Sequence, residues 1–284
     1  MLPRRILEEK LLKLLAEDVG QGDVTTDAIV SSDCTAEAEV IVKSEGIVAG
    51  IGEAVVLAEA LGLQADCDVS DGEKVANGQV IMSLTGDAAT VLTVERTLLN
   101  LLSRMSGIAT ATRALTERIH TAKLKTRIAA TRKSAPGLLY FDKKAVSIGG
   151  GDPHRLHLDD MVLIKDNHIV VVGNMAKAVK LAKENASFTK KIEVEVTSAE
   201  DALKAAELGV DIVMLDNFSA AEIKELKKQW DKEGFSGVLL EASGGITSEN
   251  VLEYAATGVD LISLGELTHS VKALDISLEI VKAA

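Results

Sequence analysis

The sequence predicts an α/β protein in two parts, an N-terminal α+β layer followed by an incomplete barrel of parallel strands and helices. Beyond Ala114, short apolar runs alternate with helix-like stretches, which is the pattern of βα units around a parallel sheet. Between about Thr35 and Met82, strand-like alternation is instead interrupted by glycine-rich turns. A chain of 284 residues, 47% hydrophobic and 26% charged, is long enough for a barrel with a small partner domain.

The N-terminal part begins with an amphipathic pattern. Ile6 and the leucines from Leu11 to Leu15 recur at near-helical spacing among charged residues, which predicts a first helix. The turn-forming segment 17–26 follows, and its Asp and Thr side chains can satisfy backbone N–H groups at the end of an element. The further expected elements are strands at 36–43, 67–69 and 79–84 and helices at 52–61 and 94–112.

The C-terminal part carries six strand-like runs separated by helical stretches. The runs lie at 126–129, 161–164, 192–196, 211–215, 237–240 and 260–264. A complete (β/α) barrel has eight strands, so this barrel is expected to be incomplete.

Polar residues and glycines follow these strands, and they predict a functional face. In parallel barrels the carboxyl ends of the strands converge on the face that carries catalytic groups, and phosphate sites form in the loops after the last two strands. Ser243, Gly244 and Gly245 follow the fifth run and Gly265 follows the sixth. Glycine lets backbone N–H groups approach phosphate oxygens, so a phosphate site is expected here. The other strand ends carry Arg132-Lys133, Lys165 to His168, Glu195 and Asp216-Asn217.

A local reversal of charge indicates the kind of ligand. The chain has 31 Lys and Arg against 43 Asp and Glu, a net charge of −12, yet Arg118 to Lys165 holds ten Lys and Arg against four Asp and Glu. The triple glycine 149–151 lies in the same segment. Fixed cations around a cleft concentrate phosphates and carboxylates, so a small polyanionic ligand is expected. The acidic balance and only 2% aromatic residues argue against nucleic acid as a partner.

Composition also bears on location. No stretch reaches the roughly 20 apolar residues of a membrane span, and the charged start gives no sign of a signal peptide. Cys34 and Cys67 are too few for a disulfide framework and lack metal-ligand spacing. We therefore expect a cytoplasmic protein in a reducing compartment, without a membrane partner.

Ordered sequence blocks along nearly the whole chain resemble the quinolinate phosphoribosyltransferase family, also called nicotinate-nucleotide pyrophosphorylase (carboxylating). The blocks are Glu17-Asp18, Gly22 to Thr26, Glu95-Arg96-Thr97, Leu99-Asn100, Ser106 to Thr110, Thr131-Arg132-Lys133, Gly149 to Gly151, His154-Arg155, Leu163 to His168, Leu215-Asp216-Asn217, Glu241 to Ile246 and Leu267 to Ser270. The resemblance implies an N-terminal open-faced α/β sandwich (1–112) and a C-terminal incomplete barrel (113–269), with a last helix at about 270–284 that packs back on the first domain. It also implies a homodimer, or a hexamer formed as a trimer of dimers, in which one subunit's N-terminal part completes its neighbour's site.

The reaction that the resemblance implies joins quinolinate to 5-phosphoribosyl 1-diphosphate with Mg²⁺. It gives nicotinate mononucleotide, diphosphate and CO₂ in de novo NAD biosynthesis. The family pattern assigns the two quinolinate carboxylates to Arg132, Lys133, His154, Arg155 and Lys165, with Arg96 from the other subunit. It assigns the ribose hydroxyls and Mg²⁺ to Glu195 and Asp216, and the 5-phosphate to Ser243, Gly244 and Gly265.

The catalytic group set implied by the resemblance is Lys133, Lys165, Glu195 and Asp216. The carboxylates of Glu195 and Asp216 stabilise positive charge on the sugar as diphosphate leaves. One of the two lysines then stabilises the carbanion that decarboxylation leaves on the quaternised ring, and the sequence leaves open which one. His269 is predicted with equal weight to cap the final helix or to touch phosphate.

Two departures from the family pattern bear on this interpretation. Many family members carry arginine at the position of Leu139 and threonine at that of Ser134, and the loss of the arginine puts rate and affinity in question.

Three further candidate functions are compatible with a barrel of this kind. A related branch linked to molybdenum-transport gene clusters shares the scaffold. A Schiff-base aldolase would use Lys165 as its nucleophile. A catalytically silent protein would bind a phosphorylated metabolite without turning it over.

Overall fold

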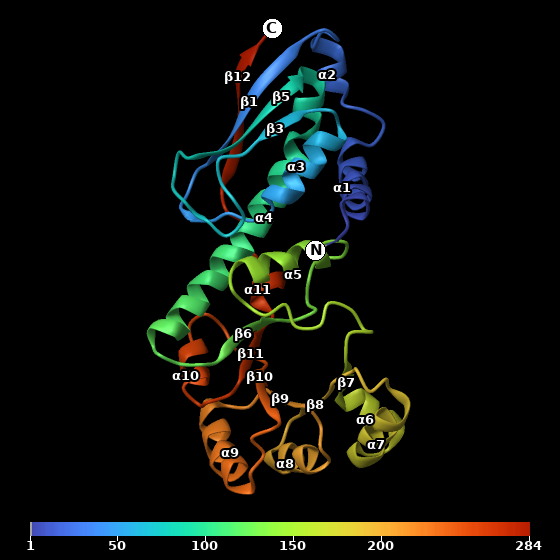
Figure 1. Cartoon of the computed structure of the whole chain (residues 1–284), viewed down its shortest axis with the longest axis vertical. Coiled ribbons are helices and arrows are strands. Elements are labelled where there is room, and N and C mark those ends of the chain that lie inside the picture. Colours follow the sequence, from blue (N-terminus) through green and yellow to red (C-terminus); the bar gives the residue numbers. More distant parts are fainter. Residues whose placement is uncertain (1) are drawn as a thin grey trace. The chain divides into compact units, whose positions relative to one another are not determined.

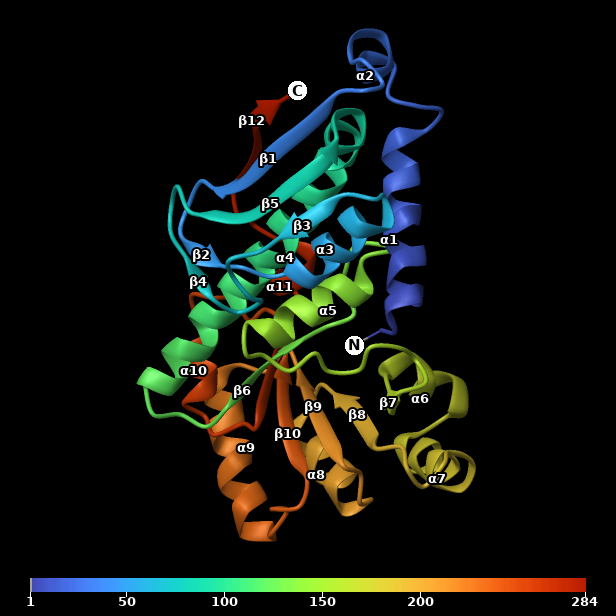
Figure 2. The same cartoon turned by 45° about the horizontal axis from the view of Figure 1, so that its top comes forward.

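A computed structural model describes residues 2–284 of the chain (Figures 1 and 2). The chain divides into two compact units, the first made of residues up to Ala111 together with Val271–Ala284 and the second of Thr112–Ser270. Within residues 2–284, no helix combines the length and the apolar character needed to cross a bilayer.

A four-stranded antiparallel sheet forms the centre of the first unit, in the order β12-β1-β5-β3 (Figure 1). Its strands are β1 (Thr35–Val42), β3 (Gln64–Asp66), β5 (Val80–Asp87) and β12 (Ile276–Ala283), and a separate short pair is formed by β2 (Gly46–Ile47) and β4 (Lys74–Val75). Ala36, Ala38, Val40 and Val42 of β1 are buried, whereas the residues between them are partly exposed. One face of the sheet therefore carries the core of this unit.

The helices of this unit are α1 (Arg4–Val19), α2 (Val24–Ile29), α3 (Ile51–Ala60) and the first part of α4 (Ala88–Thr121). α1 buries Leu7, Leu11 and Leu15, spaced four residues apart, which confirms the amphipathic prediction. The Asp23 side chain caps α2 by accepting from the backbone N–H groups of Thr25 and Thr26, at 3.2 and 3.1 Å. The expected capping is therefore confirmed, and a short helix lies where only a turn was predicted. α4 extends beyond both ends of the predicted helix.

The prediction of a last helix at about 270–284 is wrong, because this segment forms the edge strand β12. It pairs antiparallel with β1, from Ile276 opposite Val42 to Ala283 opposite Ala36. Ile276, Ile280 and Val281 are β-branched, and such residues favour a pleated surface over a helix. Without a partner strand the segment has only local patterning to guide a prediction, and β1 supplies the hydrogen bonds that decide it.

The strand predicted at 67–69 is also misplaced. The strand is β3 at Gln64–Asp66, which pairs with Ser83 to Thr85 of β5, and the chain leaves the sheet at Cys67. The position of this strand is set by its pairing with β5 and not by the apolar character of Cys67 and Val69.

The second unit is a six-stranded, fully parallel sheet in the order β6-β11-β10-β9-β8-β7. The strands are β6 (Arg127–Ala130), β7 (Val162–Ile164), β8 (Ile192–Val196), β9 (Ile212–Asp216), β10 (Leu239–Ser243) and β11 (Leu261–Leu264), so each of the six predicted strands is present. Because β6 and β7 remain edges, the barrel is incomplete, as expected.

Helices cover the strands of this unit (Figure 2). They are α5 (Leu139–Ile148), α6 (Asp166–Val172), α7 (Met175–Asn185), α8 (Ala199–Glu207), α9 (Ala220–Glu233), α10 (Val251–Ala255) and α11 (Glu266–His269). Of these, α7, α8 and α9 begin at residues whose side chains cap them. Ser198 caps α8 and Ser219 caps α9, each accepting from a backbone N–H one turn into the helix. These caps fix short connections after β8 and β9, so Glu195 and Asp216 lie at the carboxyl ends of their strands.

The triple glycine 149–151 lets the backbone pack closely against its neighbours beside β6. A Cβ at Gly151 would lie 2.7 Å from Thr112 Cγ2 and 2.9 Å from Val146 Cγ1, so only glycine fits without displacing them. The close approach lets Asp152 join β6: its N–H donates to Ile128 O at 2.7 Å, and its carbonyl accepts from Ala130 N at 3.0 Å. The segment that carries His154 and Arg155 is thereby attached to the sheet.

Candidate active site

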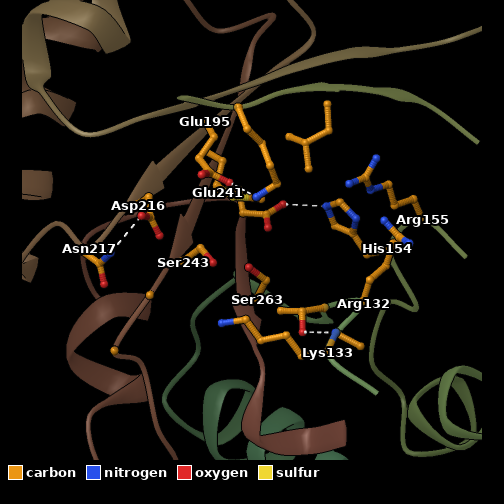
Figure 3. Close-up of a pocket in the computed structure, with 17 residues that line it drawn as sticks. Arg132, Lys133, His154, Arg155, Glu195, Asp216, Asn217, Glu241, Ser243 and Ser263 are labelled. Atoms are coloured by element: carbon orange, nitrogen blue, oxygen red, sulfur yellow. Dashed lines mark hydrogen bonds and ion pairs between the residues drawn. The ribbon is translucent and has the colours of Figure 1, made fainter. Parts of the chain in front are cut away.

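A cavity of about 590 Å³ lies at the carboxyl ends of the strands of the second unit (Figure 3). It is lined by Ala130, Thr131, Arg132, Lys133, His154, Arg155, Leu163, Lys165, Glu195, Met214, Asp216, Asn217, Glu241, Ser243, Gly244, Gly245 and Ser263. Nine of the eleven side chains and glycines that the sequence predicts for the substrates are therefore brought together here, the exceptions being Arg96 and Gly265.

One side of the cavity is cationic. Arg132 and Lys133 follow β6 in a tight turn, in which Lys133 N donates to Thr131 Oγ1 at 3.1 Å. Burial, and then the charge of Arg132, lower the pKa of Arg155. Two guanidinium groups near each other in a partly enclosed site repel, and an anionic ligand relieves that repulsion.

His154 lies between the cations and a buried carboxylate. Its Nε2 is 3.1 Å from Glu241 Oε2 and 3.6 Å from Glu193 Oε2. Burial lowers the pKa of His154, but the hydrogen bond to Glu241 and the charges of both glutamates outweigh it, so the pKa is raised.

Lys165 directly follows β7 and is the residue that precedes α6. Its backbone N–H donates to His168 Nδ1 at 2.9 Å, so the two ends of the Lys165 to His168 motif close this turn. The Lys165 ammonium forms an ion pair with the Glu195 carboxylate from β8. An ammonium engaged in this way is not the free amine that a Schiff base requires, which argues against an aldolase.

Asp216 ends β9 and lies beside Asn217, whose Nδ2 donates to Asp216 Oδ2 at 2.8 Å (Figure 3). Carboxylate oxygens such as those of Glu195 and Asp216 suit Mg²⁺. Among residues 2–284, however, these two carboxylates do not belong to a preformed cluster of metal ligands.

The loop after β10 has a backbone conformation that lets a ligand approach its N–H groups closely. Gly244 has φ +86° and Gly245 has φ +63°, both in the left-handed region that favours glycine. Asn217 N donates to Ser243 O at 2.8 Å and ties this loop to the end of β9. Within residues 2–284, the backbone N–H groups of both glycines donate to no protein acceptor, so they are available for a ligand oxygen.

Gly265 is not among the residues that line the cavity. It precedes α11, and a Cβ there would lie 2.9 Å from the His269 ring and 3.3 Å from Lys133 Cδ. Thr268 Oγ1 donates to Lys133 O at 2.7 Å. Gly265 therefore affects the site indirectly, because the absence of a Cβ lets α11 pack against Lys133. His269 Nδ1 lies 2.6 Å from Ser270 Oγ.

Four residues of the site had no predicted role: Lys143, Glu193, Glu241 and Ser263. Glu193 and Glu241 are fully buried and Lys143 is 1% exposed. Glu193 could have been found from the alternation of Ile192 to Val196, because Glu193 and the predicted Glu195 lie on the same face of the strand. The remaining three lie within apolar strands or a helix whose pattern gives no sign of function.

Comparison with known proteins identifies the family of the chain. The family model of the quinolinate phosphoribosyl transferase N-terminal domain matches residues 23–106, and that of the C-terminal domain matches residues 108–279. The chain belongs to the quinolinate phosphoribosyltransferase family.

Members of the family cover nearly the whole chain. The probable nicotinate-nucleotide pyrophosphorylase (carboxylating) of Methanothermobacter thermautotrophicus is 45% identical over 269 residues, covering 94% of this chain and 96% of that protein. The human nicotinate-nucleotide pyrophosphorylase (carboxylating) is 38% identical over 257 residues, covering 89% and 85%. The nicotinate-nucleotide pyrophosphorylase from Francisella tularensis has a TM-score of 0.87 at 37% identity, covering 99% and 98%.

The departures from the quinolinate phosphoribosyltransferase pattern lie outside the cavity lining. Leu139 is the first residue of α5, and Ser134 N donates to Arg132 O at 3.0 Å. Arg96 lies on α4 in the first unit, with a side chain that is 61% exposed and 3.5 Å from Glu95. Its expected action in a neighbouring subunit's site stays a prediction.

Proposed function

We propose that this chain transfers the phosphoribosyl group of 5-phosphoribosyl 1-diphosphate to the nitrogen of quinolinate and removes CO₂, giving nicotinate mononucleotide and diphosphate for NAD biosynthesis. The observation that carries the proposal is one cavity with two chemically distinct sides. Arg132, His154 and Arg155 lie on one side, and Glu195, Asp216 and Ser243 lie on the other (Figure 3). The first side suits a dicarboxylate and the second suits a phosphorylated sugar.

The acceptor side takes quinolinate through its two adjacent carboxylates. Arg132, Lys133, His154 and Arg155 offer several N–H donors, and a charge-assisted hydrogen bond contributes ~1.5–3 kcal/mol. Lys133 has no carboxylate partner among the described residues, whereas Lys165 is paired with Glu195. We therefore assign direct contact with a substrate carboxylate to Lys133.

The donor side takes the phosphoribosyl group. Glu195 and Asp216 accept hydrogen bonds from the ribose hydroxyls, and the free N–H groups of Gly244 and Gly245, with Ser243 beside them, bind the 5-phosphate. Gly265 supports this side by allowing α11 to approach Lys133.

Mg²⁺ belongs with the donor in this proposal, with Glu195 and Asp216 holding it directly or through water. When bound, the ion neutralises the negative charge that develops on the leaving diphosphate.

In the first step, the pyridine nitrogen bonds to the ribose C1 as the bond from C1 to the diphosphate oxygen breaks. Positive charge accumulates on the sugar ring, where the carboxylates of Glu195 and Asp216 stabilise it. The cations on the acceptor side hold quinolinate so that its nitrogen faces C1, which removes much of the entropic barrier.

In the second step, the bond between the ring and one carboxylate breaks and CO₂ leaves. The electron pair stays on the ring carbon, next to a nitrogen that is now positively charged, and the carbon then takes up one proton. A lysine ammonium stabilises the developing negative charge. Because Lys133 is free of a carboxylate partner, we assign this task to Lys133 and the task of orienting Glu195 to Lys165.

We also propose that the enzyme is a homo-oligomer in a reducing, cytoplasmic setting. A homo-oligomer with Arg96 supplied by a neighbouring subunit adds a further cation to the acceptor side. Cys34 and Cys67 are both unpaired, which supports the expected reducing cytoplasmic setting.

The direct test is formation of nicotinate mononucleotide and CO₂ from quinolinate, the phosphoribosyl donor and Mg²⁺, with nicotinate replacing quinolinate in a parallel reaction. We expect product from quinolinate only, because nicotinate would leave cations of the acceptor side without a carboxylate partner. Donor binding without diphosphate release would instead indicate the silent binding protein. Absence of both would point to the transport-cluster branch.

A further inference from the structure

Two buried carboxylates beneath the cavity take no part in the mechanism above. Glu193 projects from β8 and Glu241 from β10, and neither side chain is exposed. Barrel interiors are normally filled with branched apolar side chains. Both oxygens of Glu193 and Oε1 of Glu241 lack a hydrogen-bond partner among residues 2–284. Unpaired buried carboxylates are costly, so their presence here calls for a functional explanation.

Both carboxylates converge on His154, and Figure 3 shows its contact with Glu241. Its Nε2 lies 3.1 Å from Glu241 Oε2 and 3.6 Å from Glu193 Oε2. Since Nε2 is engaged there, Nδ1 is the ring nitrogen left for a ligand, and it has no hydrogen-bond partner in the described part of the chain.

Neighbouring groups also hold the backbone at His154 in place. Its φ of 53° lies in the left-handed region, which a residue with a Cβ adopts only where its surroundings enforce it. The His154 N–H donates to Asp152 Oδ1 at 2.8 Å, and Lys143 Nζ donates to the carbonyl oxygen of Pro153. Ring and backbone are thus fixed by groups from β8, β10 and α5.

We propose that Glu241, supported by Glu193, is the positioning residue of His154: it accepts the Nε2–H and so directs a charged Nδ1–H at one carboxylate of the substrate. The proposal rests on the proposed function, because it assigns His154 to the dicarboxylate. A neutral imidazole whose Nε2–H is held by Glu241 would present a lone pair at Nδ1 and repel a carboxylate. The glutamates therefore decide whether His154 is a donor, and they become determinants of dicarboxylate specificity.

The charges around the ring support this assignment. The charged groups that act on the imidazole are Glu241 from β10, Glu193 from β8 and Lys143 from α5, while Asp152 holds the backbone N–H of His154. Burial lowers the pKa of His154, but the hydrogen bond and charge of Glu241, followed by the charge of Glu193, outweigh it and raise that pKa. Burial, and then the charge of Glu241, raise the pKa of Glu193 itself to about 8, so Glu241 is the main partner of the imidazolium. The imidazolium therefore persists to higher pH than in a free histidine.

A double-mutant cycle of Glu241→Gln and His154→Ala tests the coupling. We expect Glu241→Gln to raise the quinolinate KM about 10-fold or more, the size of one charge-assisted hydrogen bond, and to leave the donor KM within about twofold. In the His154→Ala background, Glu241→Gln should add no further rise in the quinolinate KM. Independent, additive effects of the two substitutions would overturn the proposal.

A titration of ¹⁵N-labelled histidine by NMR tests the same point without turnover. In Glu241→Gln and Glu193→Gln the pKa of His154 should fall, while the exposed control Glu225→Gln leaves it unchanged. An unchanged pKa in both buried variants contradicts the assignment. Failure of the wild-type protein to form product would overturn the proposed function instead, and the titration would still decide the positioning.

Discussion

The side chain of Asn217 occupies the space that a Cβ at Gly244 would need. An ideal Cβ there would lie 2.4 Å from Asn217 Oδ1 and 2.9 Å from Asn217 N. Asn217 itself has φ +60°, and its N–H is bound to Ser243 O. The ends of β9 and β10 are therefore interlocked, with the predicted phosphate loop on one and Asp216 on the other.

Gly244→Ala should consequently weaken donor binding, because the loop must shift away from Asn217. We expect the KM for 5-phosphoribosyl 1-diphosphate to rise at least about 10-fold, equivalent to losing one or two phosphate hydrogen bonds. Gly258→Ala is the matched control, since Gly258 has the same φ of +86° and only Lys227 Cε nearby, at 3.8 Å. Equal donor KM values for the two variants would show that Gly244 has no special role in phosphate binding.

Lys133→Ala and Arg155→Ala should weaken quinolinate binding and leave the fold intact. Each removes a cation from the acceptor side, so the loss should be ~1.5–3 kcal/mol of binding free energy. Isothermal calorimetry measures it, and Lys177→Ala on the exposed face of α7 serves as the control. Affinity for quinolinate equal to that of the wild type would refute the assigned role.

Arg96→Ala should abolish activity, and mixing with subunits that carry a different inactivating substitution should restore part of it. If Arg96 acts in a neighbour's site, mixing Arg96→Ala with Lys133→Ala subunits creates some sites that carry both native residues. Activity per mixed dimer should then recover to a fraction of the wild-type value, while each variant alone stays inactive. Light scattering gives the oligomer size in the same samples. No recovery after confirmed subunit exchange would place Arg96 in its own chain's site or outside any site.

Removal of Mg²⁺ should stop turnover without loosening the fold. Among the described residues, Glu195 and Asp216 belong to neither of the two side-chain groups that could hold a metal ion, so we expect the catalytic Mg²⁺ to bind with the substrate and not to hold the fold together. Chelation with EDTA should therefore abolish product formation and leave Tm unchanged, and addition of Mg²⁺ should restore the activity. A large fall in Tm on chelation would indicate a structural ion.

The buried ammonium of Lys143 should make stability depend on pH in a defined direction. Burial, opposed in part by Asp152, lowers the pKa of Lys143 from 10.5 to about 8. Between about pH 8 and 10.5 the unfolded chain binds more protons at this residue than the folded chain, so stability rises with pH through this window. Relative to Lys143→Met, the wild type should gain roughly 3 kcal/mol of unfolding free energy across it. Denaturant unfolding at both ends of the window measures the gain, and a constant difference between the two proteins would contradict it.

Local pattern was sufficient to predict much of this protein. All six barrel strands, the helices α1 and α3 and the cap at Asp23 follow from periodicity and capping, because each depends on residues close together in the chain. The polar strand ends could be placed on one face for the same reason, since parallel strands share the direction of their carboxyl ends.

The partner of each element could be decided only by the tertiary structure. Residues 276–283 become a strand because β1 is beside them, although β1 lies far earlier in the chain. Glu193, Glu241 and His154 come from three separate segments, and their meeting depends on strand order and stagger that no local pattern encodes. The sequence by itself thus determined most of the elements, the cationic character of the segment around Arg132 and the family resemblance. The tertiary structure decided which charges are buried together, because burial and pairing arise only when distant segments pack against one another.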